Sequence, residues 1–130
     1  MQKTRNFILI ILFMPLFWPT FAAATSTTDN EIQHLFEFIS QSDCTFIRNR
    51  NEYPALDARD HMQHKYAYAK RWVDSAEQFI ERIASKSSIS GQRYQVRCEG
   101  QLLYSDNWLK QELARYRASQ SERHRSTSVH

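Results

Sequence analysis

Two histidines and two aspartates recur at helical spacing near the middle of the chain. His61 and His64 stand three residues apart. Asp57 and Asp60 each precede one of them by four. On a helix this spacing brings the side chains to one face, and zinc or copper sites use these residue types. The same spacing also gives ordinary Asp–His surface pairs. Because metal ligands normally converge from more than one element and no His-Glu-x-x-His motif is present, we predict no metal site and no cofactor.

A polar stripe runs beside these side chains. His61, Lys65 and Tyr68 recur next to an apolar line on the same expected helix. Together with the basic face of a strand over 93–98, the stripe would line a pocket suited to an anionic ligand. Such a stripe is also the ordinary solvated boundary of an amphipathic helix, so both interpretations stay open.

A serine-rich loop over 85–91 holds the remaining candidate chemistry. Lys86 lies beside Ser87 and Ser88, and a desolvated lysine amine can deprotonate a serine nucleophile. The chain has no Gly-x-Ser-x-Gly elbow and no Ser-x-x-Lys with a companion motif. Serines also shape loops by bonding their own backbone. We therefore predict no catalytic residue, and a loop whose backbone N–H groups can meet an anion or a peptide carbonyl.

Apolar spacing predicts the elements that position these residues. The first half contains a helix over 29–40 with a capping box of Thr28 and Glu31, a strand over 44–47 ending in a turn, and a helix over 55–73. The second half contains a helix capped by Ser75, a strand over 93–98 and a final helix capped by Ser105. The two middle helices can also be one helix bent near Asp74. No internal repeat is visible.

The N-terminus has the features of a secretory signal peptide. Lys3 and Arg5 give a positive start, an uncharged apolar run covers 7–18, and alanines at 22–24 suit a signal peptidase. We expect cleavage between Ala24 and Thr25 and a periplasmic or secreted protein. The predicted organisation is a signal peptide over 1–24, a single domain over 25–118 and a disordered basic tail over 119–130.

Charge gives no support for a nucleic-acid partner. The chain has 17 Lys and Arg against 14 Asp and Glu, and loss of Lys3 and Arg5 with the leader leaves 15 against 14. The apolar run of the leader is short for a membrane span, and Pro15 and Pro19 would interrupt a helix there. We expect no nucleic-acid partner and no stable membrane insertion; an unknown envelope protein or a small ligand is the expected partner.

Cys44 opens the first expected strand and Cys98 closes the second. Antiparallel pairing of these strands would put the two cysteines side by side. Two cysteines in an exported protein are generally paired, and no Cys-x-x-Cys redox motif is present, so we predict a structural disulfide. The predicted fold class is α+β, mainly α: about four helices packed on a short two-stranded antiparallel sheet, with one disulfide.

Five stretches share the pattern of a known family. They are Phe46-Ile47-Arg48-Asn49, His61 with Lys65, 76–80, 84–91 with 94–96, and Trp108-Leu109. In this order they resemble the YfeK-like exported bacterial proteins, a domain family of unknown function. The resemblance implies a small secreted or periplasmic protein and supplies no activity, cofactor or catalytic residue.

The polar matching positions are the candidate ligand-binding residues: Arg48, Asn49, His61, Lys65, Ser87 and Ser88. The same residues can instead make turn, cap and strand-to-helix hydrogen bonds. The chain departs from the family pattern at Arg50, where glycine is usual, and at Arg93, where proline is usual. Because arginine resists a positive φ, the first departure predicts that a tight positive-φ turn is absent there.

Three classes of function remain. The leading hypothesis is a non-enzymatic protein that binds a partner or a small anionic or peptide ligand near the 55–73 helix and the serine loop. The alternative is an envelope hydrolase that uses the loop over 85–90 or the face of His61 and His64. A third is a structural interaction module, which predicts an exposed apolar patch made by Phe38, Trp72 or Trp108.

Overall fold

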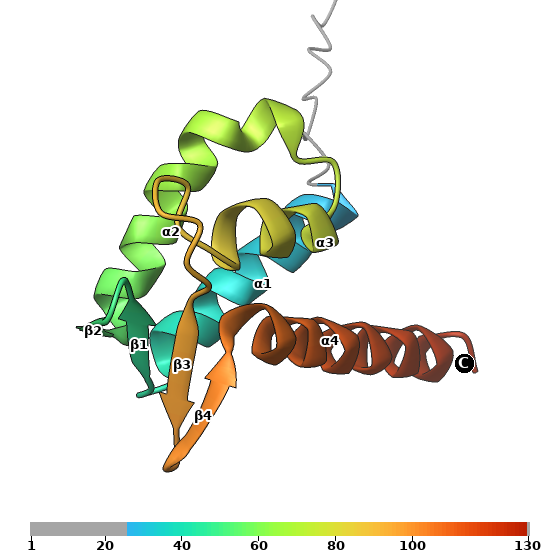
Figure 1. The fold of residues 1–130 in the computed structure, drawn as a ribbon. Coiled ribbons are helices and arrows are strands. Elements are labelled where there is room, and N and C mark those ends of the chain that lie inside the picture. Colours follow the sequence, from blue (N-terminus) through green and yellow to red (C-terminus); the bar gives the residue numbers. More distant parts are fainter. Residues whose placement is uncertain (1–25, 130) are drawn as a thin grey trace, which may run out of the picture.

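The computed structural model describes residues 26–129, in which two β-hairpins form one sheet and a helix follows each hairpin directly (Figure 1). The hairpins are β1 (Thr45–Arg48) with β2 (Asn51–Pro54), and β3 (Gln95–Cys98) with β4 (Gln101–Tyr104). The helical segments are α1 (Thr27–Gln41), α2 (Ala55–Ala69), the 3₁₀ segment η1 (Lys70–Trp72), α3 (Ala76–Phe79), the π-helical segment η2 (Ile80–Ala84) and α4 (Ser105–Thr127). The predicted class, mainly α with an antiparallel sheet and one disulfide, is confirmed.

The sheet has four strands rather than the predicted two. Its order is β2-β1-β3-β4, and every neighbouring pair is antiparallel. The central pair is the predicted one, whereas both outer strands lack a sequence signal. β2 is polar, mostly exposed and ends in Pro54, a residue that only an edge strand accepts readily. β4 is equally short and exposed, so no alternating apolar pattern marks either strand.

The second half of the domain repeats the first. Each hairpin lies between a preceding helical segment and a following helix, and counterpart strands begin fifty residues apart, as at Thr45 and Gln95. β1 and β3 pair around Phe46 and Val96, which are also fifty residues apart. An approximate two-fold axis therefore passes through the middle of the central strand pair. The sequence shows no corresponding repeat, so the similarity is one of backbone arrangement.

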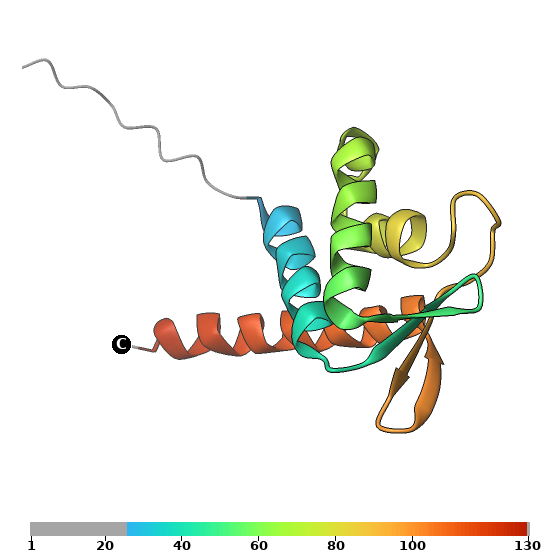
Figure 2. The ribbon, with the colours of Figure 1, turned by 90° about the vertical axis from the view of Figure 1, so that its left-hand side faces the viewer.

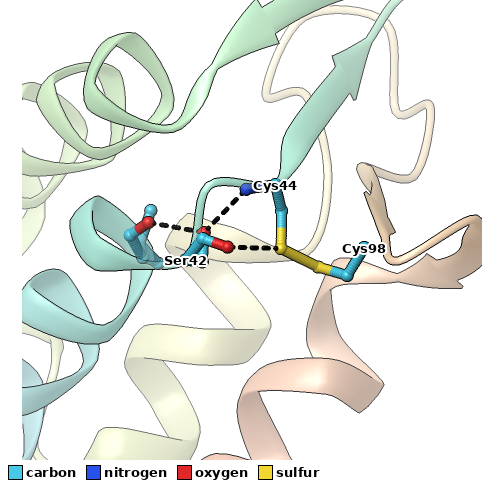
Figure 3. The surroundings of a disulfide bond; sticks show 4 residues. Ser42, Cys44 and Cys98 are labelled. Atoms are coloured by element: carbon cyan, nitrogen blue, oxygen red, sulfur yellow. Dashed lines mark hydrogen bonds between the residues drawn. A yellow bond between two sulfur atoms is a disulfide. The ribbon is translucent and has the colours of Figure 1, made fainter.

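The predicted disulfide joins Cys44 to Cys98 (Figure 3). The two Cα atoms are 4.8 Å apart, and the residues are separated by 54 positions in the chain. Ser42 holds the turn before Cys44: its Oγ donates to the carbonyl of Ile39 at 2.8 Å and accepts from the backbone N–H of Cys44 at 3.3 Å. Extending the β1–β3 register places the disulfide at one end of the ladder and Arg48 opposite Tyr94 at the other.

The core lies between the sheet and the helices. Figure 2 shows α1 beside α2, with α4 crossing beneath them. Phe79, at the junction of α3 and η2, is fully buried. Its ring meets Phe36 of α1 edge-on at 5.1 Å between centroids and Tyr66 of α2 at 5.6 Å. This aromatic cluster fixes α2, and with it the residues α2 presents to the sheet.

The start of α1 differs from the predicted capping box. The Oγ of Ser26 accepts from the backbone N–H of Asp29 at 3.1 Å, so Ser26 rather than Thr28 is the N-cap. Glu31 does not reach back to the cap. It is buried and forms an ion pair with Arg117 of α4 at 2.7 Å. A distant arginine thus replaces the local partner that the capping pattern offers.

Of the two helix caps predicted in the second half of the chain, the structure has one and lacks the other. Ser75 caps α3 as predicted, because its Oγ accepts from the backbone N–H of Gln78 at 3.2 Å. Ser105 does not cap α4. It is the first residue of that helix, its side chain is fully buried, and its Oγ has no hydrogen-bond partner within residues 26–129.

Helix α4 continues through most of the stretch predicted to be a disordered basic tail. The prediction covers 119–130, whereas the helix ends at Thr127. Gln120, Glu122, Arg123 and Arg125 favour helix in this stretch, although most of its residues are serine, threonine or histidine. Arg117 anchors the helix through ion pairs with Glu31 of α1 and Glu77 of α3.

The predicted signal peptide over 1–24 lies outside the described residues. Its cleavage and the export of the protein therefore stay predictions. Within residues 26–129, no helix has both the length and the apolar character needed to cross a membrane.

The turn of the first hairpin has positive φ values, although its sequence places arginine where glycine is usual. Asn49 and Arg50 have φ values of 50° and 67°, as a two-residue type I′ turn requires. The second hairpin has the same geometry at Glu99 and Gly100. The expectation that Arg50 excludes a positive-φ turn was wrong, because the register of the two strands fixes the turn.

We expect Arg50→Gly to stabilise the domain by about 1 kcal/mol, since glycine adopts a positive φ without steric cost. This corresponds to a rise in melting temperature of roughly 4–8 °C for a domain of this size. Arg50→Ala is the matched control, because it removes the same charge but keeps Cβ. Thermal unfolding followed by circular dichroism measures both, and equal melting temperatures for the two variants would contradict the strain argument.

Candidate functional site

A cavity of about 180 Å³ opens where β1 and β2 meet the start of α2. The greater part of its lining is apolar. The apolar residues are Phe46, Ile47, Ala58 and Met62. The polar and aromatic residues are Arg48, Tyr53, Asp57, His61 and Tyr94. The cavity therefore combines an apolar body with a polar corner.

Arg48 and His61 form this corner. Nη1 of Arg48 lies 2.8 Å from Nδ1 and 2.9 Å from Nε2 of His61, and Nη2 donates to the Tyr53 hydroxyl at 3.2 Å. Because a guanidinium can only donate, His61 must offer an unprotonated ring nitrogen. Nε2 of His61 also lies 3.3 Å from the Tyr94 hydroxyl. β1, β2, α2 and the residue just before β3 thus contribute one side chain each to a single hydrogen-bonded group.

Lys65 lies one turn after His61 on α2 and joins the corner to the serine loop. Its Nζ donates to the carbonyls of Ile83 at 2.8 Å and Lys86 at 3.0 Å. It also donates to the Tyr94 hydroxyl at 3.4 Å. These bonds hold the ammonium in place, so Lys65 adds a fixed positive charge behind Tyr94.

The charges in this region are positive and largely uncompensated. Burial, followed by the positive charge of Arg48, lowers the pKa of both His61 and Lys65. Burial raises the pKa of Tyr94. In the part of the chain that the structure describes, no carboxylate lies within ion-pair distance of Arg48 or Lys65. The corner is therefore suited to an anion that accepts hydrogen bonds.

The lowered pKa of His61 makes stability depend on pH. In the unfolded chain this histidine takes up a proton near pH 6.5, whereas in the folded chain it does so only at lower pH. The unfolded state therefore binds more protons between these values, and the free energy of unfolding falls as pH decreases through 6.5.

We expect His61→Gln to weaken this fall in the free energy of unfolding. Urea unfolding at a series of pH values measures it, with the exposed His64→Gln as control; equal acid sensitivity in His61→Gln and wild type would contradict the assignment.

The structure brings together three of the six predicted ligand-binding residues: Arg48, His61 and Lys65. Asn49 turns away, and its Oδ1 accepts from the Ser90 hydroxyl at 2.6 Å. It therefore ties the first hairpin turn to the serine loop and does not line the cavity.

The two predicted serines lie apart from the cavity lining. Ser87 is buried, and its Oγ accepts from the backbone N–H groups of Ile89 and Ser90, both at 3.3 Å. Ser88 is exposed. Among residues 26–129, no hydrogen bond joins either hydroxyl to Lys65, Lys86 or His61. The serine–lysine arrangement that the hydrolase alternative needs is not formed there.

Two cavity residues were missed as candidates, Tyr53 and Tyr94. Tyr53 lies on a strand that the sequence does not predict, and Tyr94 lies in the predicted strand over 93–98 but is not one of its basic residues. Register supplies the signal for Tyr94, because it stands opposite Arg48 when the β1–β3 pairing is extended. The polar stripe of α2 therefore meets the Tyr94 face of its strand. The basic face, which the prediction had chosen, instead pairs Arg97 with Glu52.

The remaining predicted constellations do not assemble in the described residues. Residues 26–129 contain no group of three or more His, Cys, Asp or Glu side chains that could hold a metal ion. His64 is exposed and meets the exposed ring of Tyr68 edge-on at 5.1 Å.

The three apolar residues named for the interaction-module hypothesis do not form a single cluster. Phe38 packs on Trp108 at 4.5 Å between ring centroids, and both are partly buried. Trp72 is 53% exposed and lies under the guanidinium of Arg71 at 3.9 Å.

Comparison with known proteins places this domain in a family. Residues 26–117 match the model of a "Family of unknown function (DUF5329)". The chain is also similar to the Salmonella typhimurium protein named "Uncharacterized protein YfeK", with 29% identity over 91 residues, which is 69% of this chain and 76% of that protein. No solved structure matches the chain. The family match begins at the N-cap of α1 and ends at Arg117, the residue that anchors α4. This chain therefore belongs to the DUF5329 family of unknown function.

Proposed function

We propose that this is a non-enzymatic exported protein, periplasmic or secreted, that binds a small anionic ligand in the cavity at Arg48 and His61. One observation carries the proposal: a fixed, uncompensated cationic corner opens onto a cavity. The guanidinium of Arg48 has five N–H donors, and its contacts with His61 and Tyr53 use only part of that set. Donors therefore remain for an anion.

Preorganisation supports binding. Arg48 is held by His61 and Tyr53, and Lys65 is held by two backbone carbonyls. Binding an anion consequently requires little ordering of side chains, which is a cost that flexible surface lysines and arginines would incur. A bound anion would also give Arg48 the ion-pair partner that it does not have among residues 26–129.

A titration of the protein after removal of residues 1–24, followed by ¹H–¹⁵N nuclear magnetic resonance, tests this proposal. Sodium acetate and inorganic phosphate are the probes, at constant ionic strength. We expect saturable shifts of the Arg48 side-chain resonance and of the amides of Ile47 and Tyr94. Shifts confined to the exposed end of α4 around Arg123, or shifts that never saturate, would overturn the proposal.

A further inference from the structure

Resting on the proposed function, we infer that the ligand is a monocarboxylate with a compact apolar body about the size of a six-membered ring. The inference comes from the shape and lining of the cavity and from its counterpart in the second half of the domain.

The volume of the cavity limits the size of the ligand. The cavity measures about 180 Å³. A dry cavity of roughly 150 Å³ lined by aliphatic and aromatic side chains accommodates benzene. A single-ring molecule with one small polar group is therefore of the right volume, whereas acetate alone would leave most of the apolar lining without contacts.

Polarity is unevenly distributed over the lining of the cavity. Phe46, Ala58 and Met62 are buried apolar residues and face the cavity together with the half-buried Ile47. Contact with such side chains favours a ligand by the apolar area it removes from water. The positive charge, in contrast, belongs to Arg48, which lies with His61 at one corner. A ligand that matches both features carries one anionic end and one apolar end.

The charges of the lining limit the charge of the ligand. Asp57 also lines the cavity, so its carboxylate would repel a dianion more strongly than a monoanion. A guanidinium matches the planar geometry of a carboxylate through paired N–H donors. Among small anions, these two features favour a carboxylate over a phosphate monoester.

The two halves of the domain differ at the place of the cavity. Ala58 occupies the position fifty residues before Trp108 in the structural repeat. The indole of Trp108 packs on Phe38 and on Phe46, at 4.5 Å and 5.6 Å between ring centroids. Ala58 presents only a methyl group at the equivalent place, and this difference provides room for the cavity. The disulfide likewise occupies positions equivalent to Tyr94 and Arg48, so only the first half has the cationic corner.

Titration of the protein with a set of matched probes tests the inference: benzoate, acetate, benzyl alcohol and phenyl phosphate. We expect benzoate to bind roughly 10- to 100-fold more tightly than acetate, from burial of the ring against apolar side chains. Benzyl alcohol and phenyl phosphate should both bind more weakly than benzoate. Equal affinities for benzoate and acetate at the cavity would overturn the inference and leave the proposed function intact. Absence of saturable binding by both carboxylates would overturn both.

Filling the cavity gives an independent test. Ala58→Trp should bring the ratio of benzoate to acetate affinities close to one, because it places in the first half the side chain that the second half already accommodates. The control is Ala67→Trp on the exposed part of α2, which should leave the ratio unchanged. Ala58→Leu serves if the tryptophan variant does not fold, with a smaller loss of the ratio expected. An unchanged ratio in a folded Ala58 variant would place the apolar part of the ligand elsewhere and overturn the inference.

Discussion

Replacing Cys44 and Cys98 together by alanine is expected to lower the free energy of unfolding by about 4 kcal/mol. The disulfide links residues 54 positions apart, so its removal returns a large loop-closure entropy to the unfolded chain. Domains of this size have a total stability of only about 5–15 kcal/mol. The variant should therefore be close to unfolding at physiological temperature.

Urea unfolding at equilibrium measures the loss, and the slope of the transition should increase because the unlinked unfolded chain exposes more surface. Ser42→Ala is the matched control at the same turn. It removes the hydrogen bonds to Ile39 and Cys44 but leaves the covalent link, and it should cost only about 1 kcal/mol. A double-alanine variant that loses no more than this control would show that the disulfide contributes little.

Replacing Arg48 by glutamine is expected to weaken carboxylate binding by roughly 10- to 100-fold, the usual worth of a hydrogen bond to a charged group. Glutamine retains a donor to Tyr53 but has neither the charge nor the paired donors of the guanidinium. Arg48→Lys should be intermediate, because an ammonium keeps the charge and loses the planar match to a carboxylate.

Calorimetric titration with benzoate measures these affinities. Arg97→Gln is the control, since Arg97 lies on the same sheet but is paired with Glu52, and neither residue lines the cavity. That variant should bind benzoate as the unmodified protein does. If Arg48→Gln and Arg97→Gln lose affinity equally, general charge rather than the cavity corner attracts the anion.

The sequence predicts the centre of this fold well and its edges poorly. The strand ending at Cys98 alternates polar and apolar residues and pairs as expected, because one of its faces is buried in the core. The outer strands are four residues long and each has only one partly buried residue, so burial leaves no alternating pattern in β2 or β4. Glu31 shows a related limit: the local pattern suggests a helix cap, but Arg117, far along the chain, provides the stronger partner.

The candidate site was predicted in part for the same reasons. Arg48, His61 and Lys65 are polar residues whose helix and strand were both identified. Tyr53 was missed because its strand was missed. Ser87 was selected for a hydroxyl that could react, yet that hydroxyl is occupied by backbone N–H groups of its own loop. Whether a serine hydroxyl is free to react or bonds the backbone of its own loop depends on the loop conformation. Residue type alone does not determine that conformation.

The repeat is hidden because its halves share backbone geometry and differ in side-chain chemistry. Ala58 corresponds to Trp108, and Met62 corresponds to the buried Glu112, which is paired with His34 and Arg115. Substitutions of this kind remove the similarity that a sequence comparison detects. Strand register and turn conformation remain, since these depend on backbone pairing and on two positive-φ positions in each hairpin.

The position of the disulfide also affects how the central strands open. A covalent link holds β1 to β3 beside the Thr45–Arg97 pair, whereas the pair at the other end, Ile47 with Gln95, borders the cavity. A ladder tied at one end frays from the other. We therefore expect any opening of the β1–β3 ladder to begin at the Ile47–Gln95 pair, beside the proposed ligand site, while the disulfide keeps the other end closed.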